Sequence, residues 1–339
     1  MATELAGYLA GARASVDVAI YDLVLDGALR ETVRAAVEGL LARGVRVRVV
    51  YNKEVRELPG GGPPPAGIVV PPDIFAGCDV IPIPGIPDLM HHKYVIRDSE
   101  AVWTGTTNWT NDSWALEENV IVRIASPAVA AAYEDDFEEL WSKRAVAPTG
   151  HYRPAWMDIG GGVEARVYFT PYRAPKLVTE IAQRLKTAER RIRIVSPVLT
   201  DGPILATLAE MAKDGPRIDV KGVIDATQMA EVRAQWSANH LAAWKLAALD
   251  QVLRGIPFSG KVSTPWARGS VHDYMHAKFV VCDDCVFVGS YNLSHSGESN
   301  AENVIELQSA ALADRFAAFA DRVIARYPPA RPVATESLA

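Results

Sequence analysis

The chain has 339 residues, of which 49% are hydrophobic and 22% charged, and this globular composition excludes a mostly disordered chain. Three cysteines exclude a disulfide framework. The formal net charge is −6: residues 1–150 carry 13 basic and 21 acidic side chains, and residues 151–339 carry 22 and 20. Neither part is basic enough to indicate non-specific nucleic-acid binding, although a local basic groove is not excluded.

The predicted elements occur twice in the same chain order. In the first series a helix pattern, a strand pattern, a second helix pattern and a second strand occupy residues 3–9, 16–20, 28–43 and 45–50. In the second series they occupy residues 179–185, 192–195, 203–214 and 218–224. The repeat predicts a duplicated α/β protein with mixed sheets, divided into halves 1–150 and 151–339, with residues 143–162 as the connection.

A set of polar residues repeats in register later in each half. The first set is His91, Lys93, Asp98, Gly105, Thr106, Asn108 and Glu118, and the second is His276, Lys278, Asp283, Gly289, Ser290, Asn292 and Glu302. The two sets are 185 residues apart at the histidines and 184 apart from the glycines onward. Chance does not hold so many separated positions in register, so the sequence predicts a duplication.

The repeated residues suit chemistry at a phosphate. His91 and Lys93 fall on a strand pattern, as do His276 and Lys278, so each pair is expected on one face. An imidazole attacks phosphorus or transfers a proton, while an ammonium neutralises oxygen charge. Two copies related by a pseudo-two-fold axis would place two imidazoles on opposite sides of one phosphorus, as in-line displacement requires.

The pattern His-x-Lys, four residues, Asp, followed by Gly-(Ser/Thr)-x-Asn and Glu, resembles the phospholipase D superfamily over essentially the whole chain. The resemblance implies two fused α/β/α sandwiches, one site at their interface, a phosphohistidine intermediate, and no metal or other cofactor. By this analogy His91 is the nucleophile and His276 the general acid, an order about which the sequence itself is symmetric.

The resemblance also implies roles for the other motif residues. Lys93, Lys278, Asn108 and Asn292 would hold the phosphate, with donors from the Thr106 and Ser290 hydroxyls. Glu118 and Glu302 would each orient a histidine through its second ring nitrogen. Asp98 and Asp283 fall at hairpin turns, where aspartate bonds local backbone, so we interpret them as structural.

Several residues near the motifs have plainer interpretations. Strand alternation turns His92 away from the site and favours a structural role. Cys282 and Cys285 flank a predicted two-residue turn and are interpreted as buried strand cysteines. His272 with Asp273 either lines the mouth of the site or lies in a solvated loop. Trp109 and Trp114 either contact substrate or pack in the core, and the acidic run at residues 134–139 is interpreted as a solvated helix face.

Three further expectations concern the start of the chain, membrane-spanning segments and the oligomeric state. A strand at 167–170 opens the second half, so either the natural chain starts earlier or the first sheet lacks that strand. No run of about 18 apolar residues and no signal-peptide pattern are present, so we expect a soluble chain of unknown location. We also expect a monomer.

The substrate is the least determined feature. Apolar residues in loops before each motif predict transient contact with a membrane surface: Ile68 to Phe75, Leu89 and Met90 in the first half, and Phe258 and Trp266 in the second. Packing over the core is an equal alternative. Phospholipid head-group hydrolysis or phosphatidyl transfer therefore leads. A nuclease, an enzyme for another small diester and a non-catalytic scaffold follow in that order.

Overall fold

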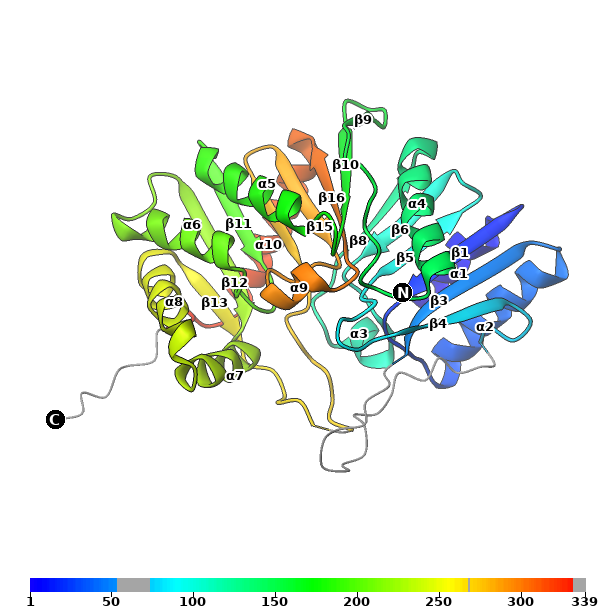
Figure 1. Ribbon diagram of the computed structural model, residues 1–339, viewed down its shortest axis with the longest axis horizontal. Helices are drawn as coiled ribbons and strands as arrows, with labels where there is room; N and C mark the ends of the chain where they lie inside the picture. Colours follow the sequence, from blue (N-terminus) through cyan, green and yellow to red (C-terminus); the bar gives the residue numbers. More distant parts are fainter. Residues whose placement is uncertain (54–73, 268, 332–339) are drawn as a thin grey trace.

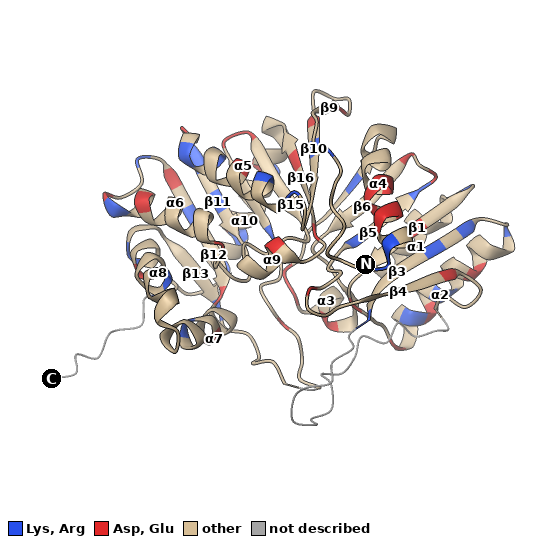
Figure 2. Cartoon of the chain, in the orientation of Figure 1, with Lys and Arg blue, Asp and Glu red and all other residues tan. Residues whose placement is uncertain are grey.

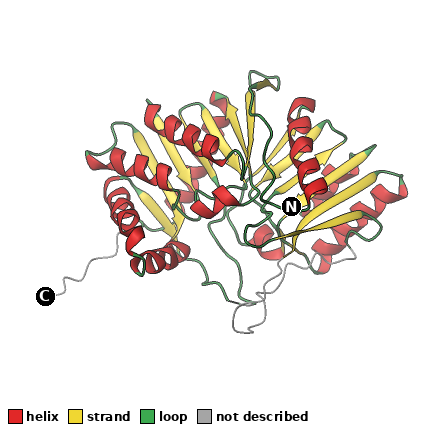
Figure 3. Ribbon diagram, in the orientation of Figure 1, coloured by secondary structure: helices red, strands yellow, loops and turns green. Residues whose placement is uncertain are grey.

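The computed structural model describes residues 1–53, 74–267 and 269–331. Two large sheets stand side by side with helices over their faces (Figures 1 and 3). The first sheet has the strand order β4-β3-β1-β5-β6-β8, and the second has β13-β12-β11-β14-β15-β16-β10-β9. The first six positions of the two orders correspond strand for strand, so the duplication seen in the sequence is a duplication of topology.

The first half consists of α1 (Ala2–Ala10), β1 (Ser15–Ile20), β2 (Leu23–Val24), α2 (Gly27–Ala42), β3 (Arg46–Lys53), β4 (Asp79–Pro84), β5 (Lys93–Arg97), β6 (Ala101–Gly105), β7 (Trp109–Thr110), α3 (Asn111–Ala115), β8 (Ile121–Ala125) and α4 (Pro127–Lys143). In its sheet β1, β3 and β4 are parallel, and β5, β6 and β8 continue antiparallel. The short strands β2 and β7 form a separate parallel pair.

The second half consists of β9 (Met157–Asp158), β10 (Glu164–Phe169), α5 (Ala174–Thr187), β11 (Arg191–Val195), α6 (Gly202–Lys213), β12 (Asp219–Asp225), α7 (Ala226–Ser237), a 3₁₀ turn (His240–Ala242), α8 (Ala243–Gly255), β13 (Phe258–Lys261), β14 (Phe279–Cys282), β15 (Cys285–Gly289), α9 (His295–Ser299), β16 (Asn303–Gln308) and α10 (Ala310–Arg326). Strand β10 extends the sheet beyond β16, and β9 follows it. Among the described residues the first sheet has no strand in the position of β10.

Equivalent helices begin at equivalent capping residues. The hydroxyl of Ser126 accepts a hydrogen bond from the backbone at the start of α4, and Ser309 does the same for α10. Thr110 and Ser294 cap α3 and α9 in the same way. Each cap satisfies a backbone N–H group that has no partner within its helix, so the local sequence sets where these helices start.

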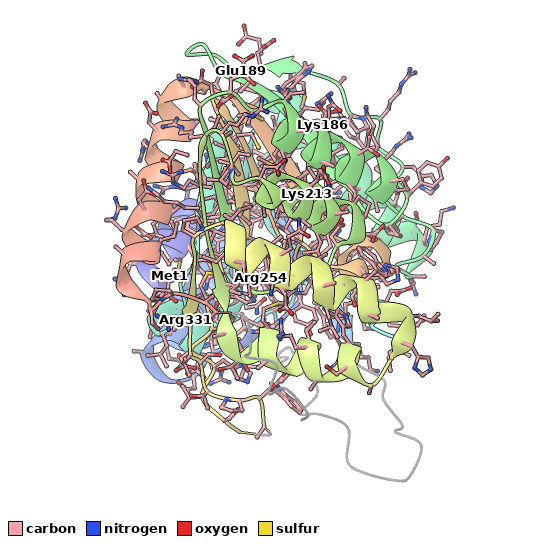
Figure 4. All side chains as sticks on the ribbon, turned by 90° about the vertical axis from the view of Figure 1, so that its left-hand side faces the viewer. Met1, Lys186, Glu189, Lys213, Arg254 and Arg331 are labelled. Carbon is pink, nitrogen blue, oxygen red and sulfur yellow. The ribbon has the colours of Figure 1, made fainter. Side chains whose placement is uncertain are left out.

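Three hydrophobic cores hold the layers together. One lies between α1, α2 and the outer face of the first sheet, and another between α5, α6, α8 and the outer face of the second. The central core contains α4, α10 and the inner faces of both sheets. Viewed from the side, α5, α6 and α8 cover one face of the second sheet while α10 covers the other (Figure 4). The two halves therefore share one core.

Aromatic and polar contacts cross between the halves in this central core. The ring of Tyr133 packs edge-on against Tyr94 at 5.0 Å and against Phe169 of the other half at 5.2 Å. Tyr133 also accepts a hydrogen bond from the Asn303 amide at 3.1 Å. Large buried aromatic side chains contribute strongly to packing, so separating the halves would expose much apolar surface.

Candidate active site

Both histidine–lysine pairs lie at one edge of the sheets, where the parallel strands β1 and β11 end. Lys93 opens β5 and pairs with Ile20, the last residue of β1. His91 precedes the strand, and His276 and Lys278 precede β14. The expectation that all four residues lie within strands is therefore wrong. Lys93 alone lies in a strand, as its first residue, and the other three lie in the segments that lead into β5 and β14.

The first histidine is oriented by a residue of the other half. His91 Nδ1 lies 2.8 Å from Glu302 Oε2, and Glu302 is fully buried. The ring of Tyr21 packs edge-on against the His91 ring at 4.5 Å. Because the carboxylate accepts from Nδ1–H, the lone pair on Nε2 remains available for chemistry.

The second histidine is oriented by a different set of groups, also from the other half. His276 Nδ1 lies 3.1 Å from Asn119 Oδ1 and 3.3 Å from Glu117 Oε2. The Asn119 amide in turn donates to Glu117 at 3.0 Å. The partners are thus crossed: each half supplies a histidine and the group that orients the other half's histidine.

Backbone register explains why Glu118 does not match Glu302. The N–H of the first motif histidine donates to the carbonyl of Ala301, and that of the second donates to the carbonyl of Glu118. Ala301 and Glu118 are therefore equivalent, and so are the next residues, Glu302 and Asn119. The two halves therefore differ in length by one residue between the Gly-x-x-Asn segment and this backbone contact. Alignment of the two Glu-Asn pairs in the sequence does not reveal the difference.

Glu118 consequently takes another position, and its expected contact with a histidine is a wrong prediction. Its carboxylate lies 2.7 Å from Lys261 Nζ and 3.2 Å from Arg326 Nη1, and it accepts from the Tyr327 hydroxyl. These contacts join the segment before β8 of the first half to the ends of β13 and α10. Glu117 was not predicted, because the backbone register makes it equivalent to Asn300, a different residue type, whose amide donates to Glu302 at 3.3 Å.

The two lysines and two histidines lie close enough to act on one another electrostatically. Lys93 Nζ donates to the backbone carbonyl of His91 at 2.7 Å, and Lys278 Nζ donates to that of His276 at 2.5 Å. Burial, followed by the charges of Lys93 and Lys278, holds the pKa of His91 well below its usual range. Burial and the same lysine charges also lower the pKa of His276.

The lysines are themselves destabilised as ammonium ions. Burial lowers the pKa of Lys93 to about 7, although the carboxylate of Glu302 opposes the shift. Burial and the charge of Lys93 hold the pKa of Lys278 well below its usual range. Burial raises the pKa of Glu302 to about 7. An anion between the two lysines would stabilise their charged ammonium forms, so the arrangement is suited to a phosphate.

The glycine of each Gly-x-x-Asn segment is required by close backbone approach. A Cβ atom on Gly105 would lie 2.2 Å from the carbonyl oxygen of Val120, and one on Gly289 would lie 2.0 Å from that of Asn303. These distances are far below contact, and the clashing atoms are backbone. Only glycine therefore lets β6 and β15 pass their neighbouring strands here.

The hydroxyls that follow these glycines do not have the role expected of them. Thr106 and Ser290 are fully buried, and each accepts from a backbone N–H of the adjoining strand at 3.0 Å. Thr106 also donates to Asn119 Oδ1 at 2.7 Å, and a hydrogen bond with Ser290 lowers the pKa of Glu302 against the larger effect of burial. The hydroxyls hold the groups that orient the histidines, which corrects their assignment as phosphate donors.

The two asparagines are differently exposed. Asn108 is buried, and its side-chain oxygen has no hydrogen-bond partner among the described residues. Its backbone carbonyl accepts from the Trp114 indole at 2.7 Å, which fixes this segment. Asn292 is half-buried. Trp109 packs in the core between α1, α2 and the first sheet. Structural contacts therefore account for the positions of Trp109 and Trp114 without a contact to substrate.

The motif aspartates lie at the opposite ends of their hairpins. Asp98 accepts from three consecutive backbone N–H groups, Arg13 to Ser15, and Asp283 accepts from the equivalent groups, Glu189 to Arg191. Glu189 marks this edge in Figure 4, away from α7 and the segment before β14. Both aspartates have positive φ, so they close the turns. Their hydrogen bonds hold the backbone at the start of β1 and of β11.

His92 lies in the interface between halves. Its ring nitrogens lie 3.3 Å from Asn303 Oδ1 and 3.2 Å from Asp136 Oδ2, and the side chain is fully buried. Asp136, within the acidic run, also accepts from the Tyr94 hydroxyl at 3.0 Å. The interpretation of the whole run as a solvated face is therefore wrong at Asp136.

Local contacts define the surroundings of the remaining residues named near the second motif. Cys282 and Cys285 face each other across β14 and β15, are buried, and are free thiols. The His272 N–H donates to Asp112 of α3 at 2.8 Å, and Asp273 accepts from Thr264 at 2.7 Å. These bonds fix the segment before β14 against the first half.

Most of the apolar residues expected at the mouth of the site are in cores. Ile74, Phe75, Met90 and Phe258 are all buried, and residues 68–73 lie outside the described residues. Leu89 is half-buried. Trp266 alone among the named residues described is strongly exposed, at 55%. Of the two interpretations, packing over the core therefore holds for most of the named residues that the structure describes, and surface exposure holds for Trp266.

Two negative findings concern the described part of the chain. It contains no group of three or more His, Cys, Asp or Glu side chains placed to hold a metal ion. Within the same residues, no helix has the length and apolar character needed to cross a membrane.

Comparison with known proteins places this site in a family context. The family described as "Cardiolipin synthase, PLD-like domain" matches residues 5–141 and 181–324. Mitochondrial cardiolipin hydrolase of Xenopus laevis is 28% identical over 138 residues, 40% of this chain and 58% of that protein. The Homo sapiens protein of that name is 30% identical over 138 residues, 40% of this chain and 48% of its own length. The chain thus spans about half the length of these curated relatives.

One solved structure shares the whole architecture. Phosphatidylserine synthase from Haemophilus influenzae Rd KW20 aligns over 97% of this chain and 84% of its own, with a TM-score of 0.65 and 13% sequence identity. At this identity the similarity is one of fold.

Proposed function

Because the chain belongs to the phospholipase D superfamily, through the PLD-like domain family that matches both halves, we propose that it is a metal-independent phosphodiesterase that acts through a phosphohistidine. The observation that carries the proposal is the crossed site. His91 is oriented by Glu302 at 2.8 Å and His276 by Asn119 at 3.1 Å, so the two halves assemble a single pair of imidazoles.

In the first step, Nε2 of His91 attacks phosphorus and the bond to the leaving oxygen breaks. His276 gives its Nε2 proton to that oxygen, which departs as an alcohol. In the second step, His276 takes a proton from water or a second alcohol, whose oxygen attacks phosphorus and releases His91. Lys93 and Lys278 neutralise the non-bridging oxygens, and Asn108 and Asn292 are proposed to donate amide N–H groups to them.

The electrostatics fit these roles. The lowered pKa of His91 keeps its Nε2 lone pair unprotonated for attack. The bound phosphate anion offsets the lysine charges that lower the pKa of His276, and Glu117 near its Nδ1 favours the protonated form. The same lysine ammonium groups repel a divalent cation, which supports a metal-independent route.

A phospholipid is the proposed substrate, with head-group hydrolysis or transfer to an alcohol. Exposed apolar side chains gather on the segment before β14 and on the α3 end that it contacts: Val262 is 75% exposed, Trp266 55%, Val271 48% and Leu116 44%. This segment, yellow to orange in Figure 1, projects below the sheet edges. Figure 2 shows basic and acidic residues interspersed over the outer elements. Transient membrane contact through this segment is therefore proposed.

The test is a side-by-side assay on phosphatidylcholine vesicles, single-stranded DNA and bis-p-nitrophenyl phosphate, after exhaustive chelation. We expect release of the lipid head group and of nitrophenol, with His91→Ala inactive on both. Cleavage of DNA alone, with a steep dependence on salt, would replace the lipid assignment by a nuclease. Complete loss on chelation, restored by Mg²⁺ or Zn²⁺, would contradict the mechanism.

A further inference from the structure

A cavity of about 320 Å³ opens at the carboxyl edge of the second sheet, and its lining includes Tyr274, two residues before the second histidine. Its walls come from α7, from the loop after β11 and from the segment before β14. Glu231, Gln228, Val198, Trp266 and Tyr274 are among the lining residues. Open α/β sheets bind ligands at the carboxyl ends of their parallel strands, and this cavity lies at that edge.

Tyr274 connects the cavity to the histidine. It lies two residues before His276, and its ring stacks on His272 at 5.2 Å. Its backbone carbonyl accepts from the N–H of Glu118, the residue after Glu117. The Tyr274 hydroxyl is buried and has no hydrogen-bond partner among the described residues. Tyr274 thus links the wall of the cavity to the chain segment that carries His276.

The cavity combines negative charge with aromatic surface. The Glu231 side chain is exposed at its wall, and Trp266 is half exposed at its rim. Burial, and then the charges of Glu117, Asp225 and Glu231, raise the pKa of Tyr274 to about 12. Carboxylates together with aromatic rings favour cations, and organic ammonium groups in particular. A second anionic group on the substrate would be repelled here.

We propose that this cavity holds a cationic amino-alcohol head group, such as choline or ethanolamine, while the phosphate lies between the histidines. The inference rests on the proposed function, in which His276 protonates the leaving oxygen. The head group carries that oxygen, so it lies on the His276 side. The unpartnered Tyr274 hydroxyl accepts a hydrogen bond from a primary ammonium, and Trp266 contacts a quaternary one.

The kinetic test compares phosphatidylcholine, phosphatidylethanolamine and phosphatidylglycerol in the same detergent micelles. We expect the wild type to prefer the two cationic head groups. Glu231→Gln should lower that preference about threefold, and Trp266→Ala about three- to fivefold. Glu210→Gln on α6 and Trp244→Ala on α8, which remove like groups elsewhere, should leave the preference unchanged.

The ratio between lipids separates this cavity from general membrane contact. Loss of a membrane contact lowers kcat/KM for all three lipids alike, whereas loss of the head-group site lowers it for the cationic pair. A wild type that prefers phosphatidylglycerol, or a ratio unchanged in both cavity variants, would overturn the inference while leaving the proposed function intact.

A binding measurement gives a readout independent of turnover. In calorimetric titrations the wild type should bind phosphorylcholine at least about threefold more tightly than glycerol 3-phosphate, and Glu231→Gln should lose that preference. Equal affinities in the wild type would overturn the inference. Preferential binding without turnover of any diester would instead retain the cavity assignment and reject the proposed function.

Discussion

The surroundings of the two histidines differ although the backbone frame around them is repeated. His91 meets the carboxylate of Glu302, which is fully buried, and packs against Tyr21. His276 meets the amide of Asn119, with the Glu117 carboxylate slightly farther away. A carboxylate stabilises positive charge on an imidazole, whereas an amide only fixes its tautomer. The duplication has kept two positions and made them electrostatically unequal.

Replacement of either histidine is expected to have the largest effect, and it tests whether the two histidines have different roles. His91→Ala and His276→Ala should each lower kcat/KM for a lipid by about 10³-fold or more, because one removes the nucleophile and the other the acid. With a nitrophenyl leaving group, which needs no protonation, His276→Ala should recover much more activity than His91→Ala.

His295→Ala provides the matched control, since this histidine is 80% exposed and pairs with Glu298 at 3.2 Å away from the site. His92→Ala should retain turnover, with reduced stability because its interface contacts are lost. Mapping of a labelled phospho-adduct decides the order of roles: an adduct on His276 would reverse the two histidines, and one on neither would exclude the mechanism.

The orienting groups give the next largest effect. Glu302→Gln should lower kcat about 100-fold, because the developing charge on His91 loses its carboxylate. Glu117→Gln should lower kcat only about tenfold, since Asn119 still holds the ring. Stopped assays with lipid and nitrophenyl substrates measure both. The alkaline limb of the kcat–pH profile should shift to lower pH for Glu117→Gln, because loss of the carboxylate disfavours the protonated form of His276.

Glu298→Gln removes a carboxylate from an exposed histidine and should leave kcat unchanged. Asn119→Asp combined with Glu117→Gln places the carboxylate where the second half has it, and should restore kcat. Equal losses for Glu302→Gln and Glu117→Gln would show that the two histidine environments are functionally alike.

The lysines predict a pH dependence. The pKa of Lys93 is about 7 in the free protein, and the ammonium form exists below that value. The charge that binds phosphate is therefore lost as pH rises, so kcat/KM should fall above about pH 7. Bound phosphate raises the pKa of the lysine, so kcat should fall at higher pH than kcat/KM. A flat kcat/KM between pH 7 and 9 would contradict this assignment.

The smallest effect is on stability. Burial lowers the pKa of Lys93, so the unfolded chain binds more protons than the folded chain between about pH 7 and the ordinary lysine value. Stability should rise with pH across this window. Lys93→Met should lack that rise and be about 1–3 kcal/mol more stable at pH 7. Urea unfolding measures both.

Lys176→Met, which changes a 56% exposed lysine, is the control and should stay within about 0.5 kcal/mol of the wild type. Inorganic phosphate should raise the Tm of the wild type more than that of Lys93→Met, because it supplies the missing counter-charge. A destabilised Lys93→Met at pH 7 would mean that the buried ammonium contributes favourably without a ligand.

Much of the fold could be predicted from the sequence, because several of the repeated residues occupy positions where the backbone conformation allows few residue types. The glycines at 105 and 289 and the aspartates at 98 and 283 hold fixed backbone geometries, and their spacing survives in both halves. The sheet orders, the duplication and the placement of both histidine–lysine pairs at one edge follow from that repeat.

The site could be predicted less completely, because its orienting groups depend on register and on long-range contacts. Glu117 lies near His276 because the register of the first half is shifted by one residue at this point, and alignment of the two Glu-Asn pairs does not reveal the shift. Glu118 contacts Lys261 instead. For apolar loop residues such as Phe75 and Met90, surface contact and core packing both stayed open, because local sequence does not show which loop residues are covered by the rest of the fold.

The shared central core has a consequence for how molecules enter and leave. Because α4, α10 and both inner sheet faces belong to one hydrophobic core, we expect the two halves to move as one body within the described residues. An opening between the halves would expose Tyr133 and Phe169, so amide exchange in β6 and β15 should be as slow as global unfolding allows. We therefore expect a substrate to enter and leave over the edge that carries the loops, without a movement of one half against the other.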